Sequence, residues 1–247
     1  MINIWTIARR EYNLYFASPV AYIVAFIILL IIGLFFFFID ISTASRQGFP
    51  PTVQNIIGIT GFMLAFLTPA ITTRLLAEER RLGTIELLLT SPVRDWELVV
   101  GKWLGAFLLL LTIMAITFIY PIILNQIVEP GIDQGPLVSG YLGLILLLSA
   151  VVAIGVFVSS LFSNQIAAFI ATMGVFIFVW WIIGIVAQVT GPLSAGNEIV
   201  SYLDFSGHFY NNFLRGVIDL TDVIYYLSVT ALGLFMATMS VEMRRWS

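Results

Sequence analysis

Long apolar segments alternate with short polar ones along the chain, and this alternation predicts the fold. A helix needs roughly 20 consecutive apolar residues to cross the hydrocarbon core of a bilayer. Six segments meet or approach this length, at residues 20–39, 54–74, 101–124, 137–160, 166–189 and 221–241. None of them carries an ionisable side chain near its middle, where such a group would be costly. We therefore predict an all-α integral membrane protein with six transmembrane helices, which form a single domain over residues 1–247.

The composition supports this prediction and argues against a separate soluble domain. The 247 residues are 60% hydrophobic and 10% charged, with a mean hydropathy of +1.03, whereas about a quarter of the residues in soluble domains are charged. No polar interval is long enough to bury a core of its own. The apolar run from Val20 to Ile39 is longer than that of a signal peptide and no small-residue cleavage site follows it, so we expect it to remain as the first membrane helix.

Lysine and arginine residues predict the orientation of the bundle. If both termini lie on one side, that side carries nine of the 11 basic residues: Arg9, Arg10, Arg74, Arg80, Arg81, Arg94, Lys102, Arg244 and Arg245. The other side carries Arg46 and Arg215. Basic residues are enriched on the cytoplasmic side of membrane proteins. We therefore predict that the termini and the segment 77–100 are cytoplasmic, in a multi-pass protein of the plasma or inner membrane.

The residues before the first span have an amphipathic pattern. Apolar side chains recur near helical spacing, at Ile4, Ile7, Ala8, Tyr12 and Tyr15, and polar ones lie elsewhere on the helical wheel, at Arg9, Arg10 and Asn13. This pattern predicts an interfacial helix over residues 1–18, which lies in the cytoplasmic headgroup layer and ends near Pro19. Its contact residues are expected to be Trp5, Arg9, Arg10 and Tyr12. The alternative is a basic leader that serves only to set the topology.

Residues 190–220 form the longest segment on the outer side. Phe205, Phe209, Phe213 and Val217 recur at every fourth position, which predicts a short amphipathic helix. This helix either dips into the membrane and caps a pathway or packs as a lid. Its candidate outer-gate residues are Phe205, His208, Phe209, Phe213 and Arg215. We expect His208, which is the one histidine of the chain, to be a structural hydrogen-bonding group and not a metal ligand.

Small and hydroxyl-bearing residues interrupt the apolar spans. Pairs such as Gly101/Gly105 and Gly155/Ser159 allow close helix packing, either within the bundle or across a dimer. Pro69 is expected to kink the second span, beside three threonines at positions 68, 72 and 73. Their hydroxyls either line a path for a substrate or satisfy backbone carbonyls within the helix.

A short isolated helix is predicted for the segment between the second and third spans, which has the sequence EERRLGTIELLLTSP. Gly83 and Thr84 can turn the chain, Thr84 suits an N-cap and Glu86 then falls in the first turn. Pro92 ends the helical stretch, and Asp95 is expected to cap the helix of the third span. A helix of about two turns is marginal in water on its own. Its leucines therefore need a partner surface, which is lipid, the protein's own helices or another protein.

The longer stretch EERRLGTIELLLTSPVRDWELVVGKWLG resembles the segment between the second and third spans of ABC-2-type transporter permeases. The matching positions are Glu79, Gly83, Thr84, Glu86, Leu87, Leu88, Thr90, Pro92, Gly101 and Lys102. The stretches TIARREYNLYFASPVAY and NNFLRGVIDLTDVIYYLS are similar to the gliding-motility-type and nitrous-oxide-reductase-maturation-type branch of that family.

The resemblance implies a permease subunit, with export as the expected direction. The short helix would be a coupling helix seated in a cleft of a separate cytoplasmic ABC ATPase. Its expected contact residues are Glu79, Gly83, Thr84, Ile85, Glu86, Leu87, Leu88, Thr90 and Pro92. Glu79 and Glu86 would pair with basic groups of the ATPase or cap backbone N–H groups locally. The implied assembly contains two ATPase copies, which bind ATP and Mg, and a second permease that is either an identical or a homologous chain. Membrane lipids are further partners, and nucleic acid is not expected.

Other function classes find less support in the residues. Cysteine is absent and there is a single histidine, so we expect neither catalytic residues nor a metal site. An intramembrane enzyme would need a nucleophile-base pair or metal ligands, and the chain does not offer them. A phosphate-binding Gly-x-x-x-x-Gly-Lys-Ser/Thr motif is missing, so no cofactor is expected on this chain. An ion-coupled carrier usually has ionisable groups at mid-membrane. A membrane scaffold that anchors an ATPase without transport remains an alternative.

Overall fold

Six helical segments of the computed structural model are long and apolar enough to cross a membrane. The structure describes residues 2–41, 52–81, 83, 93–129, 131–190 and 197–245, and these parts contain helices and no strand. The predicted all-α, six-span architecture is therefore confirmed. The predicted short helix between the second and third spans, at residues 84–92, lies outside the described residues.

The helices follow the predicted order along the chain. The first helix is α1 (Ile2–Ala17), and the first two spans are α2 (Pro19–Phe35) with the π-helical turn η1 (Phe36–Ile41), and α4 (Val53–Arg81). The third and fourth spans are α6 (Asp95–Thr117) continued by α7 (Ile119–Ile127), and α8 (Gln134–Leu161). The fifth span consists of α9 (Gln165–Ile177), the π-helical turn η2 (Phe178–Ile182) and α10 (Ile183–Thr190). Three short elements follow, α11 (Asn197–Tyr202), α12 (Phe205–Asn211) and the 3-10 turn η3 (Phe213–Arg215), before the sixth span, α13 (Leu220–Arg245).

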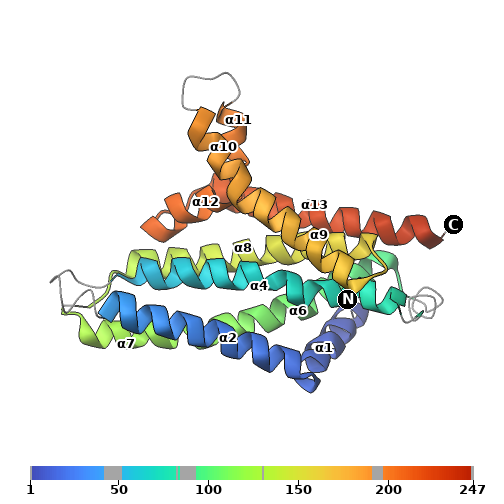
Figure 1. Cartoon of the computed structure of the whole chain (residues 1–247), viewed down its shortest axis with the longest axis horizontal. Coiled ribbons are helices and arrows are strands. Elements are labelled where there is room, and N and C mark those ends of the chain that lie inside the picture. The colour runs from blue at the N-terminus through green and yellow to red at the C-terminus, as the bar shows by residue number, and fades with distance from the viewer. Residues whose placement is uncertain are drawn as a thin grey trace.

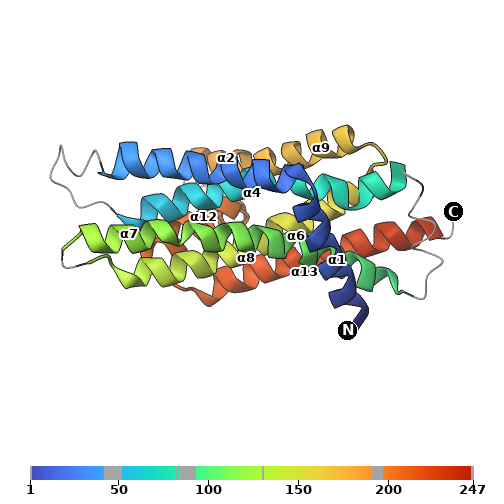
Figure 2. The same ribbon diagram turned by 90° about the horizontal axis from the view of Figure 1, so that it is seen from below.

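Helix α8 lies at the centre of the bundle, packed against α4 and α13 (Figure 1). The start of α1 and the end of α13 lie toward the same end of the bundle, on the right of Figure 1, and we call this the N/C end. Helix α1 runs across the bundle there and packs against α6 (Figure 2). The fifth span leaves the bundle obliquely, so that α10 and α11 project from it (Figure 1). Much of its apolar surface is exposed, including Ile166, Ile170 and Val189.

Two spans extend further toward the N/C end than the hydrophobic pattern predicts. The second was expected to end at residue 74, but α4 continues to Arg81. The third was expected to begin at residue 101, but α6 begins at Asp95. The extra turns are amphipathic, since Leu75, Leu76 and Leu98 are buried there beside charged side chains. The length of an apolar run therefore predicts the continuously apolar part of a helix and misses its amphipathic ends.

The outer amphipathic stretch is shorter than its repeat predicts. Phe205, Phe209 and Phe213 are buried in the bundle, whereas Val217 is 53% exposed. Helix α12 ends at Asn211, and the 3-10 turn η3 that follows it ends at Gly216, which adopts a left-handed conformation with φ of 89°.

Two of the three threonines beside Pro69 bond within their own helix. Thr68 donates to the carbonyl of Leu64 at 2.7 Å, and Thr72 donates to that of Thr68 at 3.1 Å. Both side chains are buried. Of the two alternatives for these hydroxyls, the structure therefore favours backbone satisfaction over a polar path.

Candidate functional site: the junction of α1, α4 and α6

The segment that resembles a coupling helix is attached to α4 and α6 at the N/C end. Helix α4 ends at Arg81, and Gly83 follows with φ of 70°, its N–H donating to the carbonyl of Arg80 at 3.2 Å. This left-handed position suits glycine because a Cβ would be strained there. The linker from residue 84 to residue 92 lies outside the described residues. The structure therefore shows how the helices on either side of this linker, α4 and α6, are held in place.

The start of α6 differs by one residue from the sequence prediction. Asp95 was expected to be the N-cap, but Arg94 occupies that position in extended geometry and Asp95 is the first helical residue. The cap is made by the third helical residue, since the carboxylate of Glu97 accepts the N–H of Arg94 at 3.1 Å. The same carboxylate accepts from the side chain of Asn3 at 3.2 Å. One glutamate thus closes the start of α6 and ties it to α1.

A buried ion cluster joins the three helices. The Nζ of Lys102 on α6 lies 2.8 Å from Oε1 of Glu11 on α1 and 2.7 Å from Oε1 of Glu79 on α4. Lys102 is only 1% exposed, and Glu11 is also buried. A buried ammonium group requires charged partners because the desolvation of an isolated charge is very costly. We call Glu11, Glu79 and Lys102 the junction triad.

Two glycines of α6 form the seat of α1. A Cβ on Gly101 would lie 2.8 Å from the Cβ of Ile7, and one on Gly105 would lie 2.6 Å from the Cβ of Glu11. Both separations are shorter than side chains tolerate, so only glycine allows α1 to approach this closely. The sequence pattern left open whether this pair packs within the bundle or across a dimer. Within the described structure, it packs against α1.

Helix α1 is also tied to the bundle through its tyrosines. Tyr15 donates to the carbonyl of Ile71 on α4 at 3.0 Å, and Tyr12 lies 3.0 Å from the hydroxyl of Thr112 on α6. Burial raises the pKa of Tyr15 well above its usual value, so this hydroxyl stays neutral and donates. The predicted apolar face of α1 therefore contacts protein, while Trp5, Arg9 and Arg10 are exposed on other faces.

A serine of α8 inserts into the backbone of α4 just before the triad. The hydroxyl of Ser159 accepts the N–H groups of Leu76 and Ala77 at 3.2 and 3.1 Å, and it donates to the carbonyl of Thr73 at 3.1 Å. It therefore competes with the bond between Thr73 and Ala77 that an undisturbed helix makes. Pro69, one turn earlier in the same helix, supplies no N–H at all. Both are features that allow a helix to bend.

This arrangement can transmit a displacement more readily than it can perform chemistry. The last turn of α4, the first turns of α6 and all of α1 share one buried lysine and are held as a unit. The two features of α4 that allow it to bend, Pro69 and the contact with Ser159, lie between this unit and the rest of the bundle. A movement of the linker would therefore shift the three helix ends together and bend α4 near Ser159.

The structure places some of the expected linker residues and shows others that were not expected. Glu79 belongs to the junction triad, and Gly83 follows the end of α4. The remaining expected contact residues, which are Thr84, Ile85, Glu86, Leu87, Leu88, Thr90 and Pro92, lie outside the described residues. Glu11 and Ser159 were not singled out as site residues. A signal existed for Glu11, because it falls on the apolar face of α1 between Ala8 and Tyr15, and an acidic group there implies a buried partner.

The candidate outer-gate residues lie at the opposite end of the bundle. The aromatic rings of Phe205, Phe209 and Phe213 are buried. The Nδ1 of His208 lies 2.5 Å from Oδ1 of Asp222, its Nε2 lies 2.8 Å from the carbonyl of Tyr202, and its ring stacks on Tyr225. His208 thus makes hydrogen bonds that join α11, α12 and α13. Arg215 is exposed at the end of η3.

Comparison with known families places the chain in a transporter family. A family model described as ABC-2 family transporter protein matches residues 5–239 of the chain. This match covers the first five spans, most of the sixth span and the junction triad. A comparison with curated proteins gives no match.

Proposed function

Because the chain belongs to the ABC-2 family of transporter proteins, we propose that it is the permease subunit of an ABC exporter that is driven by a separate ATPase. The match over residues 5–239 carries this proposal. The chain is a multi-pass membrane protein, and members of this family are generally non-catalytic membrane components that associate with an ABC ATPase. Two ATPase copies that bind ATP and Mg are proposed to supply the energy.

The proposed orientation places the N/C end in the cytoplasm, at the plasma or inner membrane. Nine of the 11 basic residues lie at this end in the six-span topology, as the positive-inside rule requires. The linker after Gly83 then faces the cytoplasm, where a nucleotide-driven partner would meet it. The branch of gliding-motility-type and nitrous-oxide-reductase-maturation-type permeases is the proposed subfamily.

The proposed mechanism starts at the linker. Closure of the ATPase pair on ATP would move a cleft that holds residues 84–92, and Ile85, Leu87 and Leu88 would supply the apolar contact. Because Lys102 binds both Glu11 and Glu79, the ends of α4 and α6 would move with α1. The bend near Ser159 would convert this movement into a change between α4 and α8, at the centre of the bundle.

A second permease copy is proposed to complete the membrane part of the assembly. The outward face of α2 and the oblique fifth span expose large apolar side chains, among them Phe26 and Ile166. Either lipid or a second permease can cover such surfaces. A homodimer is proposed, with a homologous partner chain as the alternative.

Capture of an ATPase by the chain tests this function. The tagged permease is co-expressed with a P-loop ATPase encoded beside its gene, purified, and reconstituted in vesicles. We expect the ATPase to co-purify and ATP hydrolysis to require both chains. An ATPase that neither binds nor changes its rate of hydrolysis in the presence of the permease would contradict the proposal. Hydrolysis without movement of any amphipathic probe across the vesicle membrane would favour the scaffold alternative.

A further inference from the structure

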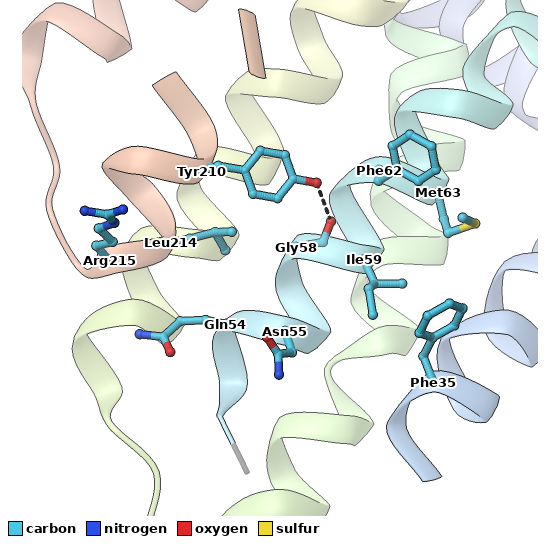
Figure 3. A pocket seen from close by; sticks show the side chains of 10 residues that line it. All are labelled: Phe35, Gln54, Asn55, Gly58, Ile59, Phe62, Met63, Tyr210, Leu214 and Arg215. Carbon is cyan, nitrogen blue, oxygen red and sulfur yellow. Dashed lines mark hydrogen bonds between the residues drawn. The ribbon is translucent and has the colours of Figure 1, made fainter. Parts of the chain in front are cut away.

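A cleft of about 770 Å³ opens between α2, α4 and the α12–η3 segment, at the end of the bundle opposite the termini. Its ten lining residues are Phe35, Gln54, Asn55, Gly58, Ile59, Phe62, Met63, Tyr210, Leu214 and Arg215 (Figure 3). This volume is within the range of small-molecule sites, which is roughly 300–1,000 Å³.

Polar and apolar groups are segregated within the cleft. Arg215 and the amide of Gln54 lie on one side, and Phe35 and Met63 lie on the other (Figure 3). Among the ten lining residues, Arg215 is the one charged group. None of the ion pairs between described residues involves its guanidinium. The cleft therefore has a cationic side without an anionic counterpart on its walls.

The length of the cleft corresponds to one leaflet of a bilayer. Gln54 lies at the start of α4 and Met63 lies further along the same helix, at a distance of about 14 Å for a rise of 1.5 Å per residue. Half of the hydrocarbon core is about 15 Å thick. The polar side thus lies at headgroup level, and the apolar side reaches toward the membrane centre.

A hydrogen bond joins α12 to α4 in one wall of the cleft. Tyr210 donates to the carbonyl of Gly58 at 3.0 Å (Figure 3). Burial raises the pKa of Tyr210 to about 12, so its hydroxyl remains neutral. A Cβ on Gly58 would lie 3.3 Å from both Tyr210 and Leu214. The wall is therefore formed by packed side chains that leave the cleft unfilled.

We propose that this cleft binds an anionic membrane lipid, with its charged head at Arg215 and one apolar chain along Ile59, Phe62 and Met63. The inference deepens the proposed function, on which it rests, because it names an anionic amphiphile as the class of cargo. A zwitterionic lipid also offers a phosphate, but its ammonium group offsets that charge, so an anionic lipid is the better counter-charge for the guanidinium. A polar solute would leave the aromatic side of the cleft uncovered, and apolar walls bind apolar groups preferentially.

Photolabelling of the purified permease, without any ATPase, tests the site. The probes are phosphatidic acid and phosphatidylcholine that carry the same diazirine in the acyl chain. We expect the anionic probe to label α4 near Met63, and the zwitterionic phosphatidylcholine probe to label it several times less. Arg215→Gln is expected to reduce anionic labelling about tenfold, the effect of losing one charge-assisted contact, while Arg215→Lys retains most of it.

Two tryptophan variants separate cleft occupancy from general membrane contact. Ile59→Trp fills the cleft and is expected to abolish labelling by the anionic probe. Ile119→Trp adds the same side chain at an exposed position of α7 and is expected to leave labelling unchanged. Equal labelling by both probes, or labelling that Arg215→Gln does not reduce, would overturn the inference. Cross-linking of the cleft to a second permease copy would also overturn it. None of these outcomes depends on the binding of an ATPase, so the lipid site and the proposed function are tested independently.

Discussion

Lys102 determines how three helices meet, although it is a single residue near the start of a membrane span. Its ammonium group is nearly inaccessible and contacts one carboxylate from α1 and another from α4. Removing one member of a buried ion pair typically costs about 3–5 kcal/mol, because the partner is left as an uncompensated buried charge. Replacing all members by neutral groups is far less damaging.

We expect Lys102→Met to destabilise the purified protein by roughly 3 kcal/mol, because Glu11 and Glu79 lose their counter-charge. The measurement is the free energy of unfolding in detergent. Combining Lys102→Met with Glu11→Gln and Glu79→Gln should recover most of the loss. Arg9→Met, at an exposed position of α1, is the matched control. A Lys102→Met protein as stable as this control would show that the junction triad contributes little.

The residue scale is also where sequence reasoning was least complete. The motif containing Gly101 and Lys102 was identified from its resemblance, but the partners of Lys102 were not, because Glu11 lies 91 positions away in the chain. Glu79 was expected to meet a partner protein or a backbone cap, and the structure pairs it with Lys102. Such pairings depend on tertiary packing, which one sequence does not encode at any fixed spacing.

At the scale of elements, α1 shows the largest difference between the partner expected for its apolar face, the lipid headgroup layer, and the partner in the structure, which is protein. Its amphipathic pattern predicts a helix with an apolar face, and the structure has a helix over Ile2–Ala17. That face contacts α6 and α4 through Ala8 and Tyr15. Hydrophobic periodicity identifies a buried face but cannot tell protein from lipid as its partner. Among the residues of α6, the glycine pair was the sequence feature that indicated close packing by another helix.

We expect Gly105→Leu to displace α1, because its side chain would occupy the space of Glu11. Hydrogen exchange of the backbone amides of α1, measured by mass spectrometry, should become faster. The control is Gly174→Leu, since a Cβ at Gly174 meets no atom within 4 Å. Unchanged exchange of α1 in the Gly105→Leu protein would contradict the seating of α1 on α6.

The spans themselves were predictable because apolar length is a strong signal. All six were found from the sequence, and the errors lie at their ends, where α4 and α6 continue as amphipathic turns. The outer helix ends at Asn211, and the 3-10 turn after it ends at the left-handed Gly216, which an apolar repeat at every fourth position does not reveal. The cleft was not predicted, since its walls come from three segments that are distant in the chain.

At the scale of the whole molecule, the proposed ATPase attachment and the proposed lipid site lie at opposite ends of one bundle. The N/C end contains the junction triad and the attachment of the linker, and the opposite end contains the cleft and the His208 network. Helices α4 and α8 connect them through the centre. This division predicts that variants of the cleft affect lipid binding and variants of the linker affect the ATPase.

The orientation of the bundle can be measured directly because the chain contains no cysteine. Cysteines introduced at the exposed positions Arg81 and Glu129 lie at opposite ends of the bundle. We expect a membrane-impermeant maleimide to label Glu129→Cys in intact cells, and Arg81→Cys only after the membrane is opened. The reverse pattern would overturn the proposed cytoplasmic location of the N/C end.

The central claim is that the segment after Gly83 docks on a nucleotide-driven ATPase, and co-purification of that ATPase with linker variants tests it most directly. We predict that the parent chain and Ile218→Asp, an exposed position at the far end, capture the ATPase equally. Leu87→Asp and Gly83→Pro should lose it while remaining in the membrane at normal amounts. Capture at the parent level by both linker variants would contradict the account.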